Sequence, residues 1–155
     1  MNKLRIALLV LVGTLSGYLL FSEARPVSGA PEFDHATVHV TDVQKSVDFY
    51  EKVMELKQIP DPFKDGRHAW FRAGAHEQFH VASGAKEAAN HDIEDHVAFR
   101  VASMTDFMKR LDQMRVKYRA FAEDKPEATL RPDGVKQVYL QDPDGYWIEV
   151  NNDKY

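Results

Sequence analysis

Four side chains of metal-ligand type stand at matched places in this sequence. His35 and His96 each begin an alternating apolar segment, and His80 and Glu149 each lie between two apolar residues. Because side chains alternate between the two faces of a strand, His80 and Glu149 should point away from the core that their neighbours fill. Imidazole and carboxylate groups suit Fe(II), Zn(II), Ni(II), Mn(II) or Co(II). We therefore predict one divalent-metal site formed by His35, His80, His96 and Glu149, with Glu149 and His80 also the catalytic candidates.

An internal repeat relates these residues. Segments Asp34–Val40 and Asp95–Val101 share the order aspartate, histidine and alternating apolar residues. A helix-start pattern follows each segment, T-x-x-Q from Thr41 and S-x-x-D from Ser103, and we expect both hydroxyls to cap a helix. The repeat gives the two histidines equivalent positions, so they face one another if the two halves close around a cleft.

The elements that position the site follow from the apolar spacing. Each expected helix carries apolar residues at i, i+4 and i+7, which is typical of a core-facing side. These stripes are Val43, Val47, Tyr50 and Met54 in the first half, and Met104, Met108, Leu111 and Met114 in the second. Strands are expected at 67–72 and 78–82 in the first half, and at 137–140 and 146–150 in the second.

The remaining segments connect these elements. Residues 142–145 form a tight-turn sequence, and residues 55–65 and 123–134 are predicted loops with room for a short irregular strand. A half-sheet of this size cannot bury both of its faces alone, so two copies should pair edge to edge. We predict an α+β fold in which two paired βαβββ modules, approximately residues 32–84 and 93–152, form an open, curved, barrel-like sheet around a cleft.

The other histidines are weaker candidates. His39 lies on the same strand face as His35, so it is a second candidate for proton transfer or substrate contact. We expect His68, His76 and His91 to be solvated, because they fall in loops or at strand starts. The repeated aspartates Asp34 and Asp95 are expected to make strand-start hydrogen bonds rather than bind metal.

Three segments carry a family resemblance. Residues 33–50, 95–101 and 139–149 resemble signatures of the vicinal oxygen chelate superfamily, which includes glyoxalases, bleomycin resistance proteins and extradiol dioxygenases. The resemblance covers about residues 32–152. It implies paired modules whose strands bind one metal, with His35, His96 and Glu149 as ligands. The fourth ligand, often Glu or Gln in glyoxalase I and the epimerases, corresponds to His80 here. In extradiol dioxygenases two His and one Glu suffice, so His80 would there lie beside the metal or contact substrate.

The resemblance leaves three functions open. The leading one is a metal-dependent lyase or isomerase of glyoxalase type, in which a divalent metal chelates two neighbouring oxygens of a small substrate. The second is Fe(II)-dependent ring opening of a catechol-type compound. The third is a binding protein of the resistance type, with a cleft lined by Trp70, Phe71, Tyr139 and Trp147. A homodimer is expected from the resemblance alone.

Composition excludes several other classes. The chain has 155 residues, of which 44% are hydrophobic and 28% charged, and its net charge is −4. The basic residues are scattered, so we predict no nucleic-acid partner. The absence of cysteine excludes disulfides, thiolate metal sites, a cysteine nucleophile and an acylated-cysteine anchor.

The first thirty or so residues differ from the rest. Lys3 and Arg5 precede an apolar run over residues 6–21, and the following Ser22-Glu23-Ala24 suits signal-peptide cleavage. The run is shorter than the roughly 20 apolar residues that a spanning helix usually needs. An exported domain, periplasmic or extracellular, or one anchored to the membrane and facing outward is expected, with a buried helix as the remaining alternative. We predict a signal peptide or membrane anchor at 1–24 with its tether at 6–21, a linker at 25–31, and the globular domain at 32–155.

Overall fold

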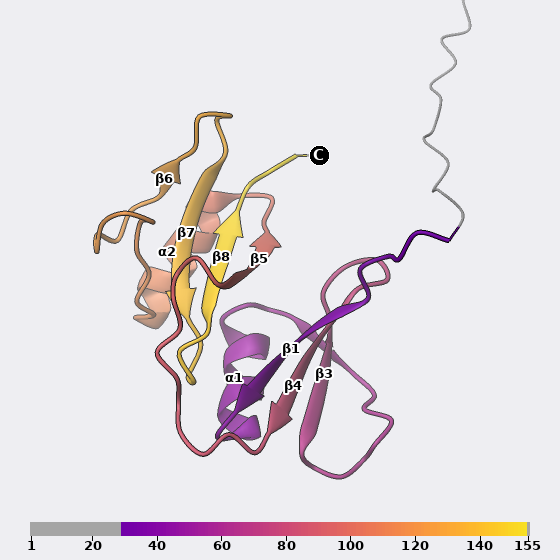
Figure 1. The fold of residues 1–155 in the computed structure, drawn as a ribbon. Helices are drawn as coiled ribbons and strands as arrows, with labels where there is room; N and C mark the ends of the chain where they lie inside the picture. Colours follow the sequence, from indigo (N-terminus) through magenta and orange to yellow (C-terminus); the bar gives the residue numbers. More distant parts are fainter. Residues whose placement is uncertain (1–28, 155) are drawn as a thin grey trace, which may run out of the picture. The chain divides into compact units, whose positions relative to one another are not determined.

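A computed structural model describes residues 29–154, in which two helices and eight strands follow one another in two similar halves (Figure 1). The first half contains β1 (His35–Val40), α1 (Val43–Lys52), β2 (Lys57–Ile59), β3 (His68–Arg72) and β4 (Gln78–Ser83). The second contains β5 (His96–Arg100), α2 (Met104–Met114), β6 (Thr129–Leu130), β7 (Lys136–Gln141) and β8 (Trp147–Asn151). The predicted βαβββ modules are confirmed.

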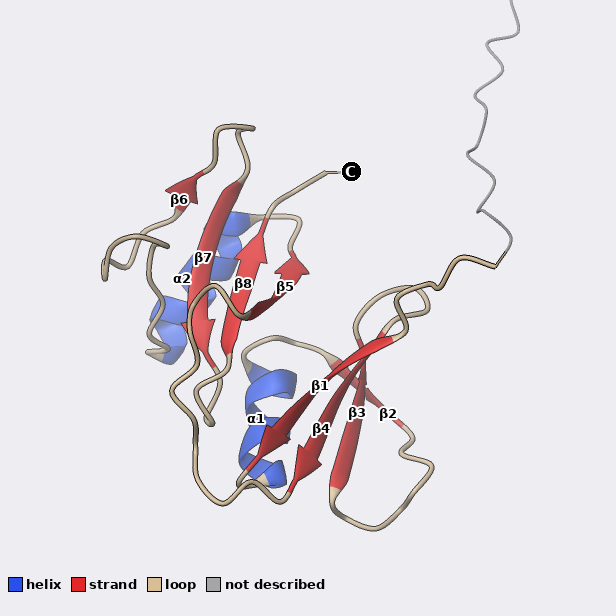
Figure 2. Ribbon diagram, in the orientation of Figure 1, coloured by secondary structure: helices blue, strands red, loops and turns tan. Residues whose placement is uncertain are grey.

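Each half forms its own four-stranded sheet. The strand orders are β1-β4-β3-β2 and β5-β8-β7-β6, with a parallel pair at the first step of each sheet and antiparallel pairs elsewhere. Figure 2 shows that each helix lies against one face of its own sheet. Backbone pairing does not continue from one sheet into the other among residues 29–154. The α+β class is confirmed, as two open sheets rather than a closed barrel.

The two faces of each sheet differ in chemistry. Alternate residues such as Val38, Phe71 and Val81 are buried under the helices, together with Val138 and Ile148 of the second sheet. The opposite, open face of the first sheet carries His35, His39, His68, Trp70 and His80, and that of the second carries His96, Gln137, Tyr139, Trp147 and Glu149. The strand register therefore places all the predicted ligands on the open faces.

Helix α1 starts differently from the prediction. Its N-cap is Asp42, whose carboxylate Oδ1 accepts hydrogen bonds from Gln44 N at 3.0 Å and Lys45 N at 3.2 Å. The predicted cap, Thr41, lies one residue too early, and its backbone N–H instead donates to Asp144 Oδ1 at 2.7 Å. The prediction of a Thr41 cap was wrong because Asp42 sits where a side-chain oxygen reaches two free N–H groups at once.

Helix α2 confirms its predicted start and corrects its predicted stripe. The hydroxyl of Ser103 accepts a hydrogen bond from Asp106 N at 3.2 Å, as expected. Met104 and Leu111 are buried, but Met114 is 41% exposed, and Phe107 is 3% exposed in its place. Met114 was misassigned because the helix ends at that residue and Arg115 follows in the left-handed conformation. The apolar stripe therefore runs through Met104, Phe107, Met108 and Leu111, so three of the four predicted residues are confirmed.

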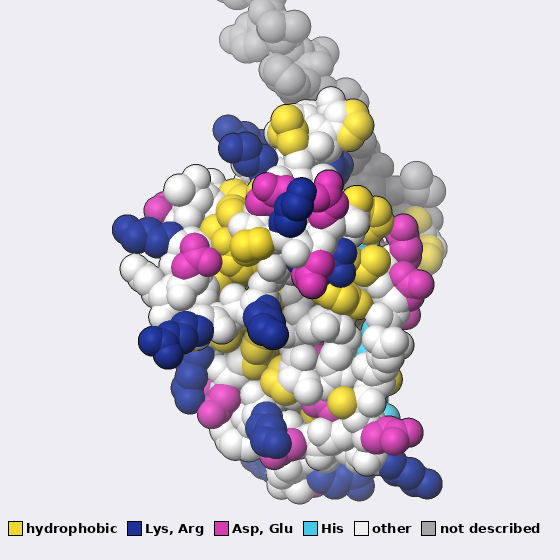
Figure 3. Space-filling view, turned by 90° about the vertical axis from the view of Figure 1, so that its left-hand side faces the viewer, with side chains coloured by type: hydrophobic (Ala, Val, Ile, Leu, Met, Phe, Trp, Pro, Cys, Tyr) yellow, Lys and Arg dark blue, Asp and Glu magenta, His cyan; other side chains and the backbone are white. Residues whose placement is uncertain are grey.

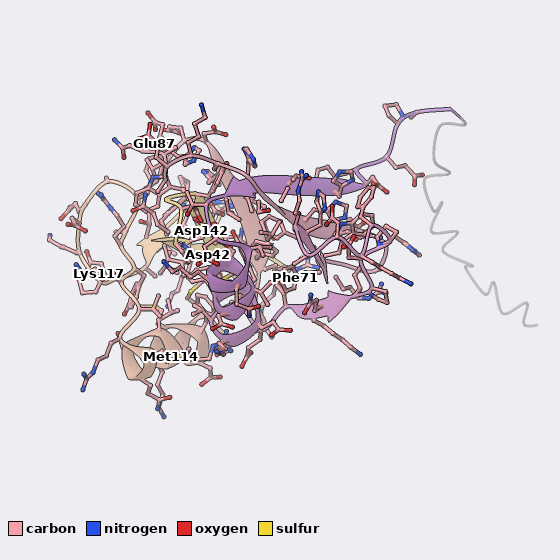
Figure 4. The ribbon with its side chains drawn as sticks, turned by 90° about the horizontal axis from the view of Figure 1, so that it is seen from below. Asp42, Phe71, Glu87, Met114, Lys117 and Asp142 are labelled. Carbon is pink, nitrogen blue, oxygen red and sulfur yellow. The ribbon has the colours of Figure 1, made fainter. Side chains whose placement is uncertain are left out.

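The turn between β7 and β8 joins the two halves. Tyr50 of α1 donates from its hydroxyl to Asp142 Oδ2 at 2.9 Å, and the Tyr146 hydroxyl bonds both the N–H and the carbonyl of His39 at 3.1 Å. Figure 4 labels Asp142 close to Asp42, the residue that caps α1. Gly145 has φ of 89°, and a Cβ there would lie 2.3 Å from Ala89 O. The predicted tight turn is therefore also a contact between the modules.

Several predicted N-terminal segments lie wholly or mostly outside the residues that the structure describes. The predicted signal or anchor at 1–24, its tether at 6–21 and most of the 25–31 linker precede the described residues. Within residues 29–154, neither helix is long and apolar enough to cross a membrane. The face in Figure 3 shows Lys and Arg mixed with Asp and Glu rather than a field of one sign.

Candidate functional site

Three rings stack on the open face of the first sheet. The ring of His80 lies between those of His35 and Trp70, with centroid distances of 4.2 Å and 3.9 Å. Strands β1, β4 and β3 position these rings. His80 is the register partner of both Thr37 and Trp70, and His35 lies two residues before Thr37 on the same face. His35 Nδ1 lies 2.6 Å from Asp34 Oδ2, a carboxylate oxygen that can only accept, so Nε2 of a neutral His35 ring carries the lone pair.

His80 is held as a neutral ring. Burial under its neighbours lowers its pKa, and the adjacent His35 lowers it further because a second positive charge is unfavourable there. His80 Nε2 lies 2.9 Å from Gln78 Oε1, an oxygen that accepts. Nδ1 is then the nitrogen with a lone pair, and it is available to bind a metal or a proton.

His96 and Glu149 meet on the open face of the second sheet. His96 Nε2 lies 3.4 Å from Glu149 Oε2, while His96 Nδ1 lies 2.7 Å from the Ile93 carbonyl oxygen. The carbonyl can only accept, so Nδ1 donates, and Nε2 of a neutral ring faces the carboxylate with its lone pair. The parallel pairing of β5 with β8 sets this contact by placing Ala98 beside Glu149, and His96 beside Trp147.

A polar network surrounds the Glu149 carboxylate, which is 6% exposed. The Tyr139 hydroxyl donates to Oε2, Asn151 Nδ2 donates to Oε1 at 2.7 Å, and Gln137 Nε2 donates to the Tyr139 hydroxyl at 2.9 Å. Burial and the neighbouring Glu149 raise the pKa of Tyr139, so its proton stays on the phenol. The network holds Glu149 as an oriented carboxylate.

The structure brings the four predicted ligands together as two pairs. His35 stacks on His80 in one module, and His96 contacts Glu149 in the other. Among residues 29–154, three metal-ligand side chains place donor atoms within 4.8 Å of one another in one cluster, Asp61, Asp65 and His68. The described chain does not bring three of the predicted four this close, and the complete set stays a prediction.

The other predicted residues have mixed outcomes. His76 is exposed, as expected, and Asp34 does bond at the strand start. His68 and His91 were expected to be solvated, but His68 bonds Asp65 and packs against Phe63, and His91 stacks on Tyr146 at 3.9 Å.

The aromatic residues proposed for a binding cleft divide between the two faces. Phe71 lies in the core with no exposed area, because its strand position places it under the helices. Trp70, Tyr139 and Trp147 are on the open faces.

Sequence reasoning missed the partners of Glu149. Gln137, Tyr139 and Asn151 lie on the same face as Glu149 because of the antiparallel register between β7 and β8. The available signal was alternation, since residues 137 and 139 are two apart, as are 149 and 151. Arg119 adjoins this network through an isolated bridge to Tyr139, and because it lies outside the named strands, alternation does not reveal it.

Known proteins resemble this chain in sequence and in fold. The sequence matches the model of the Glyoxalase/Bleomycin resistance protein/Dioxygenase superfamily over residues 32–150. The chain belongs to this superfamily. The sequence is also 25% identical over 171 aligned residues to a protein named lactoylglutathione lyase from Pseudomonas putida, an alignment that covers 90% of this chain and 94% of the relative.

A second sequence relative agrees with this assignment, and a solved structure shares the fold. A protein named Glyoxylase I 4 from Arabidopsis thaliana is 28% identical, covering 77% of this chain and 69% of the relative. The crystal structure of the fosfomycin resistance protein FosX from Listeria monocytogenes matches with a TM-score of 0.63 at 17% identity, covering 81% of this chain and 95% of FosX. The structural match supports the fold. At the level of the family, the names of the relatives support glyoxalase-like, metal-dependent activity.

Proposed function

We propose that this protein is a metal-dependent lyase or isomerase of glyoxalase type that acts on a small, oxygen-rich substrate. Its ligands would be His35, His80, His96 and Glu149, and its substrate would present two neighbouring oxygens to the metal. Superfamily membership supports the class of chemistry. The contact between His96 and Glu149 supports the placement of the metal.

The donor chemistry of this contact fits a divalent cation. Nε2 of His96 and the Glu149 carboxylate face each other at 3.4 Å, and both offer lone pairs when the imidazole carries its proton on Nδ1 alone. Two acceptors at this distance repel, and either a metal ion bound by both or a proton on Nε2 removes the repulsion. His96 is also anchored through Nδ1 to a backbone carbonyl, which is the usual support of a metal-binding histidine.

Four ligands require the open faces of two modules to meet. Within one chain the two pairs lie on separate sheets, and β1 and β5 are edge strands. The hollow of about 620 Å³ between the modules is lined by residues such as Ala36, Val97 and Phe99, which lie on the helix-facing side of the sheets and not on the open faces that carry the ligands. We propose a homodimer in which His35 and His80 of one copy meet His96 and Glu149 of the other.

The side chains then divide the chemistry. When bound, the metal would act as a Lewis acid toward the two substrate oxygens. Glu149, with its orientation set by Tyr139 and Asn151, can accept a proton from a carbon next to those oxygens. His80 has one lone pair, on Nδ1, so it serves either as a metal ligand or, in a site completed by the other three predicted ligands, as a neutral group that binds a proton and returns it.

Metal content is the first measurement. The full chain, purified without chelator and without a histidine tag, should hold about one Fe, Zn, Ni, Mn or Co ion per protomer by elemental analysis. His96→Ala and Glu149→Gln should lose most of this metal, whereas His76→Ala should keep it, because His76 is exposed in the loop between β3 and β4, outside the strands that carry the predicted ligands. Wild-type protein that stays metal-free after reconstitution with every candidate ion would refute the proposal.

The reaction can be tested on the metal-loaded protein. The first activity to assay is that of a lyase on lactoylglutathione, because the Pseudomonas putida relative carries this name. We expect activity to follow metal content across the same variants. Catalysis that is equal in Glu149→Gln and wild type would remove Glu149 from its proposed role as base.

A further inference from the structure

An arginine lies in line with the Glu149 network. Arg119 and Tyr139 exchange backbone hydrogen bonds at 2.8 Å and 2.9 Å, and Tyr139 is the register partner of Glu149. Directly paired residues point to the same face of a sheet. Arg119, Tyr139 and Glu149 therefore form a row across the open face, and about 10 Å separates the first Cα from the last, because neighbouring strands lie about 5 Å apart.

Arg119 differs from the other partly buried arginines. Arg110 forms an ion pair with Glu55, and Arg131 forms one with Asp133. Arg119 has no ion pair with any of the described residues, and its only hydrogen bond from the side chain runs from Nε to Ala120 O at 3.1 Å. Its two terminal nitrogens are thus left with no protein partner within residues 29–154.

The surface beside Arg119 is hollow. Arg119, Gln141 and Trp147 line two neighbouring hollows of about 450 and 400 Å³. The larger hollow is also lined by Lys117, which is exposed, and by Asp124, and the smaller one by Asp92. Neither of these two carboxylates forms an ion pair with Arg119. Trp147 is the register partner of His96, so these hollows adjoin the proposed metal-binding pair.

We propose that Arg119 binds an anionic group of the substrate, a carboxylate or a phosphonate, while the metal-binding oxygens lie at His96 and Glu149. This inference rests on the proposed function and specifies its substrate class. A guanidinium matches two oxygens of such a group with two parallel N–H donors, and a partly buried site strengthens the contact. Arg119 is a specificity residue that recognises the end of the substrate remote from the reacting oxygens.

The first test uses two chelators that differ by one charge. Acetohydroxamic acid and adipic monohydroxamic acid both present two neighbouring oxygens to a metal, but the second adds a carboxylate. Calorimetry on the metal-loaded full chain should show binding about tenfold tighter for the carboxylate compound. Arg119→Gln should abolish this preference and leave the affinity for acetohydroxamic acid unchanged, and Arg119→Lys should restore part of it. Arg115→Gln, a change at an exposed arginine four residues away, should keep the preference.

The second test is independent of the metal. Inorganic phosphate is titrated into metal-free protein of the Trp70→Phe background, so that fluorescence reports Trp147 alone. Saturable quenching should occur in this background and be lost on adding Arg119→Gln, with unchanged melting temperature. Absent quenching, or an unchanged phosphate affinity in Arg119→Gln, would overturn the inference even if the protein binds metal. Quenching by phosphate in a protein that never binds metal would instead refute the proposed function and retain the anion site.

Discussion

Asp142 is a carboxylate that the fold buries almost completely, since its exposed fraction is 5%. It accepts hydrogen bonds from the Tyr50 hydroxyl and from the N–H groups of Asp144 and Tyr146. Burial nevertheless raises the pKa of Asp142, because its desolvation outweighs the hydrogen bonds that favour the charged form. The contact between the two modules therefore contains a buried carboxyl group whose ionisation makes the stability of the folded protein depend on pH.

The pH dependence has a definite sign. A carboxyl with a folded-state pKa above its unfolded value of 3.8 binds more protons when folded, so its contribution to stability falls as pH rises through that interval. Asp142→Asn cannot ionise. The free energy of unfolding of this variant, minus that of wild type, should increase as pH rises from about 4 toward neutrality. Urea unfolding at a series of pH values measures this difference.

A control of opposite sign is available at Asp133. A hydrogen bond from the Val135 N–H and the neighbouring Arg131 lower the pKa of this exposed carboxyl. The free energy of unfolding of Asp133→Asn, minus that of wild type, should therefore decrease as pH rises. If Asp142→Asn shifted stability by the same amount at every pH, burial would not control the ionisation of Asp142.

At the scale of elements, the start of α1 shows how one residue sets a boundary. Asp42 has extended backbone, with φ of −138° and ψ of 105°, and caps two N–H groups. Asp42→Ala should lower the free energy of unfolding by about 1 kcal/mol, and Asp42→Asn should keep most of the stability. Thr41→Ala should change it by less than about 0.5 kcal/mol, because the Thr41 hydroxyl caps nothing. Urea denaturation of the three variants decides between the caps, and a larger loss at Thr41 would reverse the assignment.

The elements were predictable where their signal is local. Alternation placed β1, β3, β4, β5, β7 and β8 within one residue or so of their bounds, and Ser103 marked the start of α2. Met114 and Phe107 exchanged roles because the apolar stripe ends where the helix ends, which spacing alone does not reveal. Strand β2 has three residues and β6 has two, so neither is long enough to show a period.

The site was predictable only to the level of single strands. Alternation predicted that His80 and Glu149 face away from the core. The register confirms this, since His80 lies on the same face as His35 and Glu149 on the same face as His96. The contacts of Tyr139, Asn151 and Arg119 depend on which strands are neighbours and on their register, and both are set by long-range pairing. No local pattern in residues 136–141 encodes the partner strand, so these contacts required the structure.

The two ligand pairs lie on separate sheets, so how the chains assemble decides whether one metal can bind both pairs. Each pair is incomplete, since a metal site in a protein usually takes three or more side chains. Two chains related by a twofold axis can each supply both pairs, so two equivalent sites form per dimer. A chain that has lost one pair and a chain that has lost the other can then complement each other.

Complementation between two double variants distinguishes sites formed between chains from sites formed within one chain. The double variants His35→Ala/His80→Ala and His96→Ala/Glu149→Ala should each bind little metal alone. If the sites form between chains, a mixture that has been unfolded and refolded together should regain about a quarter of the wild-type metal, because half of the dimers are mixed and each has one intact site. Elemental analysis after gel filtration measures this. A mixture that regains nothing, although wild type treated in the same way recovers its metal, would place both pairs of each site in one chain, and the modules would then have to close on each other within that chain.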